Sequence, residues 1–93
     1  MSDPTLKLVV AWSDSRNLCS LVRDALHEIV PEDEMRALGD DATVVHTAEA
    51  ASAIRDRLRD RLLSGDHVFV AEFETWSGHG PALDARWLVA RGH

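Results

Sequence analysis

The chain has 93 residues, a single cysteine and a formal net charge of −6, from 16 acidic and 10 basic side chains. This length suits one domain over residues 1–93 with a modest core, and the acidic balance is not typical of a protein whose main task is to coat nucleic acid. One cysteine excludes an internal disulfide and no apolar run is long enough to span a bilayer, so we expect a cytoplasmic protein with no membrane part.

The first predicted elements are a strand and a helix. The strand covers Leu6 to Trp12 and is apolar on both faces apart from Lys7. The turn Ser13-Asp14-Ser15 offers three possible caps for the helix, which should end at Val30 because Pro31 disfavours helical geometry in the residue before it. The apolar stripe of this helix consists of Leu18, Val22, Ala25, Leu26 and Ile29.

Two interpretations are open for residues 31–41. Pro31 followed by acidic residues, with Gly39 further on, is typical of a short helix. The topology instead requires a short edge strand near Glu34 to Leu38, joined by a turn over residues 39–41 to a strand that begins at Ala42. We favour the edge strand.

The stretch from Thr43 to Glu74 organises the chain as a strand, a helix and a second strand over His67 to Glu74. Thr47 is the predicted N-cap of the helix and Gly65 its left-handed C-cap. An apolar stripe recurs at steps of three and four, at Ala51, Ile54, Leu58 and Leu62.

The outer face of this helix alternates between arginine and aspartate. We expect ion pairs three residues apart, at Asp56/Arg59 and Arg57/Asp60. A solvated surface is favoured over a basic strip for phosphate contacts, because aspartates interrupt the arginines.

The two predicted helices can cover only one face of the sheet. Helices that follow their strands by right-handed crossovers lie on the same side of what we expect to be a small mixed sheet. Val68 and Val70, or their counterparts on the other side of the last strand, would then be exposed, and an open apolar patch usually marks an interface. A symmetric homodimer is the simplest cover.

The C-terminal segment contains a Trp/Gly loop and one more element. Pro81 is placed to open a short helix with Leu83 and Trp87 on one face, although residues 86–90 would also fit a strand. We favour the helix because alanine and leucine outnumber β-branched residues. In the loop, Trp76 either plugs the end of the core or stacks on a ligand, with His79 as the second candidate binding residue.

About half of the chain resembles a known family. The run TVVHTAEAASAIRDRLRDRLLSGDHVFVAEFETWSGHG resembles the SinR-like family, with a strand ending in a small polar turn, a helix with an IRD-L core, a strand and a Trp-small-Gly motif. The family is similar in fold to the small CRISPR adaptation endoribonuclease and to some toxin-antitoxin nucleases. The resemblance implies an α+β fold of the ferredoxin-like βαββαβ type and a homodimer.

The chemistry implied by the resemblance depends on one acidic residue. In the CRISPR nucleases an aspartate directly follows an aromatic residue at the end of the first strand, and a dimer-related pair binds a divalent metal. Here Trp12 is followed by Ser13, and the acid is Asp14. The resemblance implies that paired Asp14 carboxylates bind Mg²⁺ or Mn²⁺ and activate water, with Ser13 and Arg16 contacting the phosphate of RNA or DNA.

Because Asp14 lies one residue beyond the position of the nuclease aspartate, two functions remain open. A one-residue slip in a strand reverses the side-chain direction, so we favour Asp14 as a helix cap. The first hypothesis is a homodimeric SinR-like protein derived from a metal-dependent endoribonuclease or endonuclease. The alternative is a non-catalytic acidic dimeric module that binds another protein. His46 and His67, on neighbouring strand ends, are a further candidate pair for acid/base work, although an incidental pair is commoner.

Overall fold

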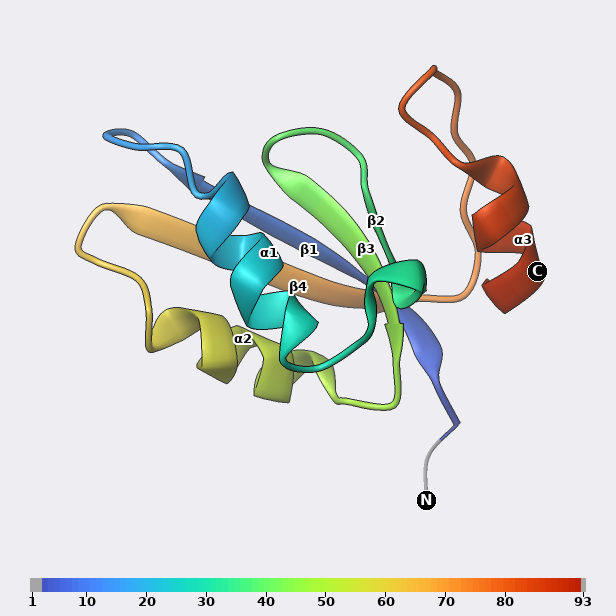
Figure 1. Ribbon diagram of the computed structural model, residues 1–93, viewed down its shortest axis with the longest axis horizontal. Helices are drawn as coiled ribbons and strands as arrows, with labels where there is room; N and C mark the ends of the chain where they lie inside the picture. The colour runs from blue at the N-terminus through green and yellow to red at the C-terminus, as the bar shows by residue number, and fades with distance from the viewer. Residues whose placement is uncertain (1–2, 93) are drawn as a thin grey trace.

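The computed structural model describes residues 3–92, which form a four-stranded sheet, three α-helices and one short 3₁₀ helix (Figure 1). The elements in chain order are β1 (Thr5–Ser13), α1 (Cys19–His27), η1 (Glu32–Glu34), β2 (Met35–Ala37), β3 (Ala42–Thr47), α2 (Ala51–Arg59), β4 (Asp66–Phe73) and α3 (Ala85–Gly92). The strand order is β2-β3-β1-β4. This is the predicted ferredoxin-like βαββαβ arrangement, followed by a C-terminal helix instead of a strand.

The sheet is antiparallel throughout, so the prediction of a mixed sheet is wrong. β1 pairs antiparallel with both β3 and β4, and β2 pairs antiparallel with β3. Each helical crossover does return the chain parallel to the strand it left. β1 and β2 are parallel to each other, but β3 lies between them. β3 and β4 are also parallel to each other, but β1 lies between them, so no two parallel strands are neighbours in the sheet.

Residues 31–41 satisfy both sequence interpretations in turn. Pro31 precedes the single 3₁₀ turn η1, as its fixed φ favours, and the predicted edge strand follows as β2. Met35 leaves the turn with extended geometry, pairs with Val45 and is buried in the core. The helix is short because its continuation would withdraw Met35 from that core.

The predicted helix caps at Thr47, Ser13 and Gly65 are wrong. Thr47 is the last residue of β3, paired with Thr5, and its hydroxyl accepts a hydrogen bond from the Glu49 N–H at 3.1 Å. Ser13 likewise extends β1, because it pairs with Asp66. α1 and α2 therefore begin later, at Cys19 and Ala51, and Gly65 has a positive φ of 93° in the α2–β4 loop beyond the helix end. These boundaries are set by strand pairing between residues that are distant in the chain, which the local sequence does not reveal.

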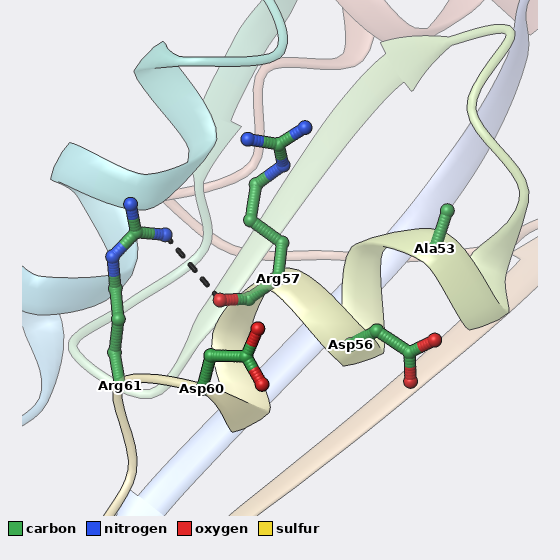
Figure 2. A pocket seen from close by; sticks show the side chains of 5 residues that line it. All are labelled: Ala53, Asp56, Arg57, Asp60 and Arg61. Carbon is green, nitrogen blue, oxygen red and sulfur yellow. Dashed lines mark hydrogen bonds between the residues drawn. The ribbon is translucent and has the colours of Figure 1, made fainter.

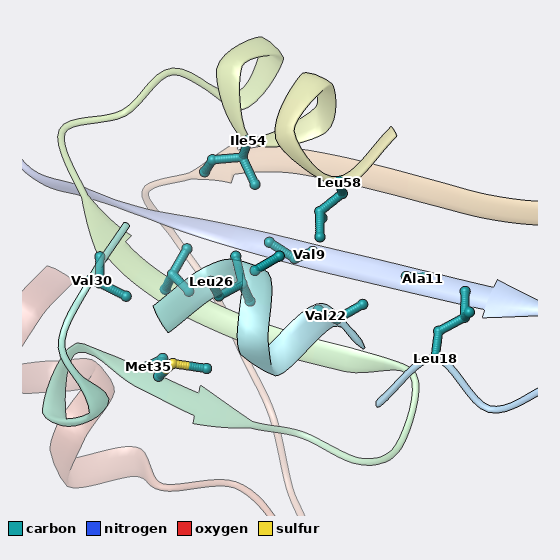
Figure 3. Packing of buried hydrophobic residues seen from close by; sticks show 11 residues of the cluster. Val9, Ala11, Leu18, Val22, Leu26, Val30, Met35, Ile54 and Leu58 are labelled. Atoms are coloured by element: carbon teal, nitrogen blue, oxygen red, sulfur yellow. The ribbon is translucent and has the colours of Figure 1, made fainter. Parts of the chain in front are cut away.

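The main core lies between the sheet and the helices α1 and α2, which occupy the same face as predicted (Figures 1 and 3). Ala25, Leu26 and Ile54 are completely buried there, against Val9 and Ala11 of β1. We call this face the inner face of the sheet. Val68 and Val70 pack against this core. The exposed side of β4 is therefore the one that carries Phe69.

The third helix covers part of the opposite, outer face. Trp87 and Leu88 of α3 are buried against Leu6 and Val44, in a second hydrophobic cluster. α3 begins at Ala85 and not near Pro81, because the Asp84 carboxylate accepts a hydrogen bond from the Trp87 N–H at 3.1 Å and caps the helix. Within residues 3–92, no helix is both long enough and apolar enough to cross a membrane.

Candidate functional site

The predicted site residues form two separate groups. Ser13, Asp14 and Arg16 lie at the C-terminal end of β1, whereas Trp76 and His79 lie in the β4–α3 loop. β1 and β4 are antiparallel, with Ser13 opposite Asp66 and Leu6 opposite Phe73. The two groups are therefore at opposite ends of the sheet and do not form one site.

Arg16 and Ser13 both lie beside Asp66, Arg16 through its guanidinium and Ser13 as the residue paired with Asp66 in the sheet. The side chain of Asp66 is only 1% exposed, and its Oδ2 accepts hydrogen bonds from the Arg16 guanidinium and, at 2.9 Å, from the Leu63 N–H. The Arg16 guanidinium, the Leu63 N–H and the Ser13 hydroxyl hold the pKa of Asp66 well below its usual range. Arg16 is thus engaged in an intramolecular ion pair, and a phosphate would have to compete with Asp66 for it.

Asp14 lies next to Ser13 in the chain but takes no part in these contacts. Its side chain is exposed and has no hydrogen-bond or ion-pair partner among residues 3–92, so it is not the predicted helix cap. The hydrogen bond nearest the start of α1 comes from Asn17, whose side-chain Oδ1 accepts from the Cys19 N–H at 2.7 Å. Across the described part of the chain, no group of three or more His, Cys, Asp or Glu residues is placed to hold a metal ion. The residues of one chain therefore do not fit a Mg²⁺ or Mn²⁺ site at Asp14.

The predicted approach of His46 and His67 is wrong. β3 and β4 lie on opposite sides of β1, and the two histidines face opposite ends of it, because His46 pairs with Leu6 and His67 with Trp12. The Nδ1 atom of His46 lies 2.7 Å from a Glu34 carboxylate oxygen. The ring of His67 stacks on Trp12, with the centroids 5.1 Å apart.

The arginines of α2 are compensated by neighbouring acids. A surface hollow of about 410 Å³ lies over the side of α2 that faces away from the sheet. It is lined by Ala53, Asp56, Arg57, Asp60 and Arg61 (Figure 2). The predicted Asp56–Arg59 pair is present at 3.4 Å. The predicted Arg57–Asp60 pair is not formed, because Arg57 and Arg61 both reach Glu28, the residue that follows α1. This face is therefore a set of ion pairs rather than a free basic strip.

Trp76 lines an apolar pocket on the outer face, whereas His79 is exposed and does not. The pocket has a volume of about 280 Å³, and we call it the Trp76 pocket. It is lined by Leu8, Leu38, Val44, Ala71, Phe73, Thr75, Trp76, Ser77, Leu83 and Leu88. Trp76 also packs against the second hydrophobic cluster, which agrees with its predicted structural role at the end of a core.

The remainder of the outer face is open. Trp12 is 41% exposed and Phe69 is 56% exposed. They are diagonal neighbours across β1 and β4, because Phe69 pairs with Val10 and Trp12 with His67. We call these four residues, Val10, Trp12, His67 and Phe69, the outer strip. None of the four is acidic.

Comparisons with family models, with curated proteins and with solved structures found no match to this chain. The SinR-like resemblance and the nuclease chemistry that it implies therefore remain predictions from the sequence.

Proposed function

We propose that the protein is a homodimeric interaction module that associates through the outer strip. The observation that carries this proposal is the exposure of Trp12 and Phe69 as neighbours on a sheet face that α3 covers only in part. Burial of apolar surface stabilises an interface by about 25 cal/mol per Å². A contiguous patch containing two large aromatic side chains is typical of an association surface.

Three features favour a second copy of this chain as the partner. A two-fold interface brings the same patch of both copies together, so aromatic residues meet aromatic residues. The strip lacks carboxylates in a chain of net charge −6, so two acidic copies repel each other least when they meet there. β4 carries His67 and Phe69 of the strip and, among the described residues, pairs on one side only, so no further strand of this chain separates the strip from a second copy at that margin of the sheet.

Sedimentation velocity at micromolar concentration tests the proposal. The wild-type chain is expected to sediment with the mass of two chains, and Phe69→Lys with the mass of one, because a lysine in the strip would be desolvated against its symmetry mate. Leu63→Lys is the matched control, since Leu63 is also apolar and 65% exposed but lies outside the strip. A wild-type chain that sediments as a single subunit, or a Leu63→Lys effect equal to that of Phe69→Lys, contradicts the proposal.

A second candidate is metal-dependent cleavage of RNA or DNA, as the family resemblance implies. The observation that favours it is the position of Asp14, which is exposed and lies two residues beyond Trp12 of the outer strip. Association over the strip would bring the Asp14 residues of both copies to one interface, where a shared ion would have more than one carboxylate. Seven arginines already form ion pairs with acids within the chain, which favours the interaction module.

Incubation of the purified protein with labelled RNA and DNA, in Mg²⁺ or Mn²⁺, separates the two candidates. Cleavage that is lost in Asp14→Ala and retained in Asp40→Ala, an exposed aspartate of the β2–β3 turn, supports the nuclease. Cleavage that Asp14→Ala leaves unchanged removes Asp14 as the site. A dimer that neither binds nor cleaves either nucleic acid supports the interaction module.

A further inference from the structure

We propose that a hollow between α1 and β2 binds a small molecule that carries a single carboxylate. The hollow has a volume of about 380 Å³, and we call it the Arg23 hollow. It is lined by Cys19, Arg23, His27, Glu32, Met35, Arg36, Ala37 and Thr43. It shares no residue with the outer strip, so the proposal is independent of self-association.

Arg23 is a cation without a counter-ion in the folded chain. Eight of the ten lysine and arginine side chains form ion pairs with carboxylates within residues 3–92, whereas Arg23 and Arg86 do not. The polar contact of Arg23 in that range is a hydrogen bond from Nη2 to the Cys19 sulfur at 3.8 Å, along the wall of the hollow. A guanidinium is a fork of N–H donors that matches the two oxygens of a carboxylate.

The other charged groups of the hollow set the charge of its ligand. Arg36 is held in place, because Nη1 donates to the Met35 carbonyl oxygen at 2.8 Å and Nε donates at 3.3 Å to Asp84, which does not line the hollow. Two guanidinium groups therefore line the hollow with one carboxylate, that of Glu32, and one positive charge is left over. A monoanion balances this charge, whereas a dianion would add an excess negative charge beside Glu32.

The rate of alkylation of Cys19 measures the attraction of the hollow for a carboxylate, because Cys19 is the only thiol of the chain. Iodoacetate and iodoacetamide are attacked by the same thiolate with loss of iodide, and they differ in carrying a carboxylate or a neutral amide. A change in the thiolate population therefore cancels from the ratio of the two rate constants. We expect this ratio to be higher in the folded chain than in urea, and to fall about fivefold in Arg23→Gln. Arg86→Gln, which removes the other unpaired arginine, should leave it unchanged.

A second pair of molecules separates binding from a general effect of charge. Benzoate and benzamide have the same shape, and only benzoate carries a carboxylate. At constant ionic strength, benzoate should slow the reaction of Cys19 with the neutral reagent iodoacetamide in a saturable way, and benzamide should not. Arg23→Gln should abolish this protection. The Nε–H resonance of Arg23 in a ¹H–¹⁵N spectrum is an independent readout, which benzoate alone should move.

The proposal is overturned if benzoate gives no protection, if benzamide protects equally, or if Arg23→Gln leaves the rate ratio unchanged. Phe69→Lys should be protected by benzoate like the wild type, because Phe69 lies outside the hollow. Loss of the dimer in that variant without loss of protection keeps the two proposals distinguishable.

Discussion

Asp66 shows how a buried carboxylate makes stability depend on pH. Its pKa lies below the ordinary value of about 3.9, first because the Arg16 guanidinium donates to it and then because the Leu63 N–H does so. Lowering the folded-state pKa means that folding favours the ionised form. The resulting stabilisation is fully present above pH of about 4, and it is lost as the pH falls towards the folded-state pKa.

We therefore expect Asp66→Asn to lower the urea midpoint at pH 7, and its deficit relative to the wild type to shrink as the pH falls from 5 to 2. Equilibrium unfolding at several pH values measures this. Asp24→Asn, at an exposed position of α1, should follow the wild-type curve throughout. A deficit for Asp66→Asn that stays constant over the whole pH range would show that the carboxylate charge is not the cause.

Lys7 is a charged residue near the start of the otherwise apolar strand β1, and its polar partners explain its burial. Its side chain is 2% exposed, and the ammonium group donates to the Thr5 hydroxyl at 2.6 Å and to the Thr47 carbonyl at 2.8 Å. A Glu72 carboxylate oxygen lies 3.4 Å away. The charge is buried because it has these partners, which the alternation of the strand alone does not reveal.

At the scale of elements, α3 is held by a polar clasp as well as by apolar contact. The Trp87 ring lies close to the guanidinium groups of Arg36 and Arg91, at 5.3 and 4.7 Å from the ring centroid. Arg91 also pairs with Glu34 at 2.9 Å, and this pairing is the largest cause that lowers the pKa of Glu34. α3 is therefore fixed to η1 and β2 through charged groups around one indole.

Trp87→Phe is expected to lower the free energy of unfolding by about 1–2 kcal/mol, because the aromatic surface remains but the hydrogen bond to the Asp33 carbonyl is lost. Trp87→Ala, which also opens a cavity, should cost about 3–5 kcal/mol. Urea unfolding measures both values, and hydrogen exchange should show α3 amides losing protection before those of β1. Equal costs for the two variants would mean that the clasp, and not the packing, holds α3.

The elements themselves were largely predictable from the sequence, whereas their boundaries were not. Two-faced apolar strands and helical stripes such as that of Ile54 and Leu58 specify which segments fold and which side they bury. Whether Thr47 caps a helix or extends a strand depends on its pairing with Thr5, which lies far away in the chain. The same holds for Ser13, whose partner Asp66 sets the end of β1.

The candidate sites were predictable in part, for the same reason. Strand alternation places Asp14 and Arg16 at the end of β1, but no local pattern shows that Arg16 is held by Asp66, fifty residues later. The Trp76 pocket is assembled from residues between Leu8 and Leu88, so the sequence marks its tryptophan but not its cavity. Sites built by long-range contacts need the register of the whole sheet.

At the scale of the whole molecule, the three layers are unequal. α1 and α2 cover the inner face, while α3 and the Trp76 loop cover only the end of the outer face that contains Leu6 and Val44. The outer strip remains exposed at the other end. A second copy would complete the third layer. The folded chain would then be more stable as an assembly than alone, because a partner that binds only the folded state stabilises that state.

This coupling predicts a melting temperature that depends on protein concentration. A tenfold increase in concentration stabilises a folded dimer by about 1.4 kcal/mol, which corresponds to a rise of about 3–5 °C for a two-chain unit of this size. Differential scanning calorimetry over two decades of concentration measures it. Phe69→Lys should give curves that superimpose, because its folded form is one chain, and Leu63→Lys should keep the wild-type slope. Superimposable wild-type curves would mean that the outer strip is not covered by a second copy during folding.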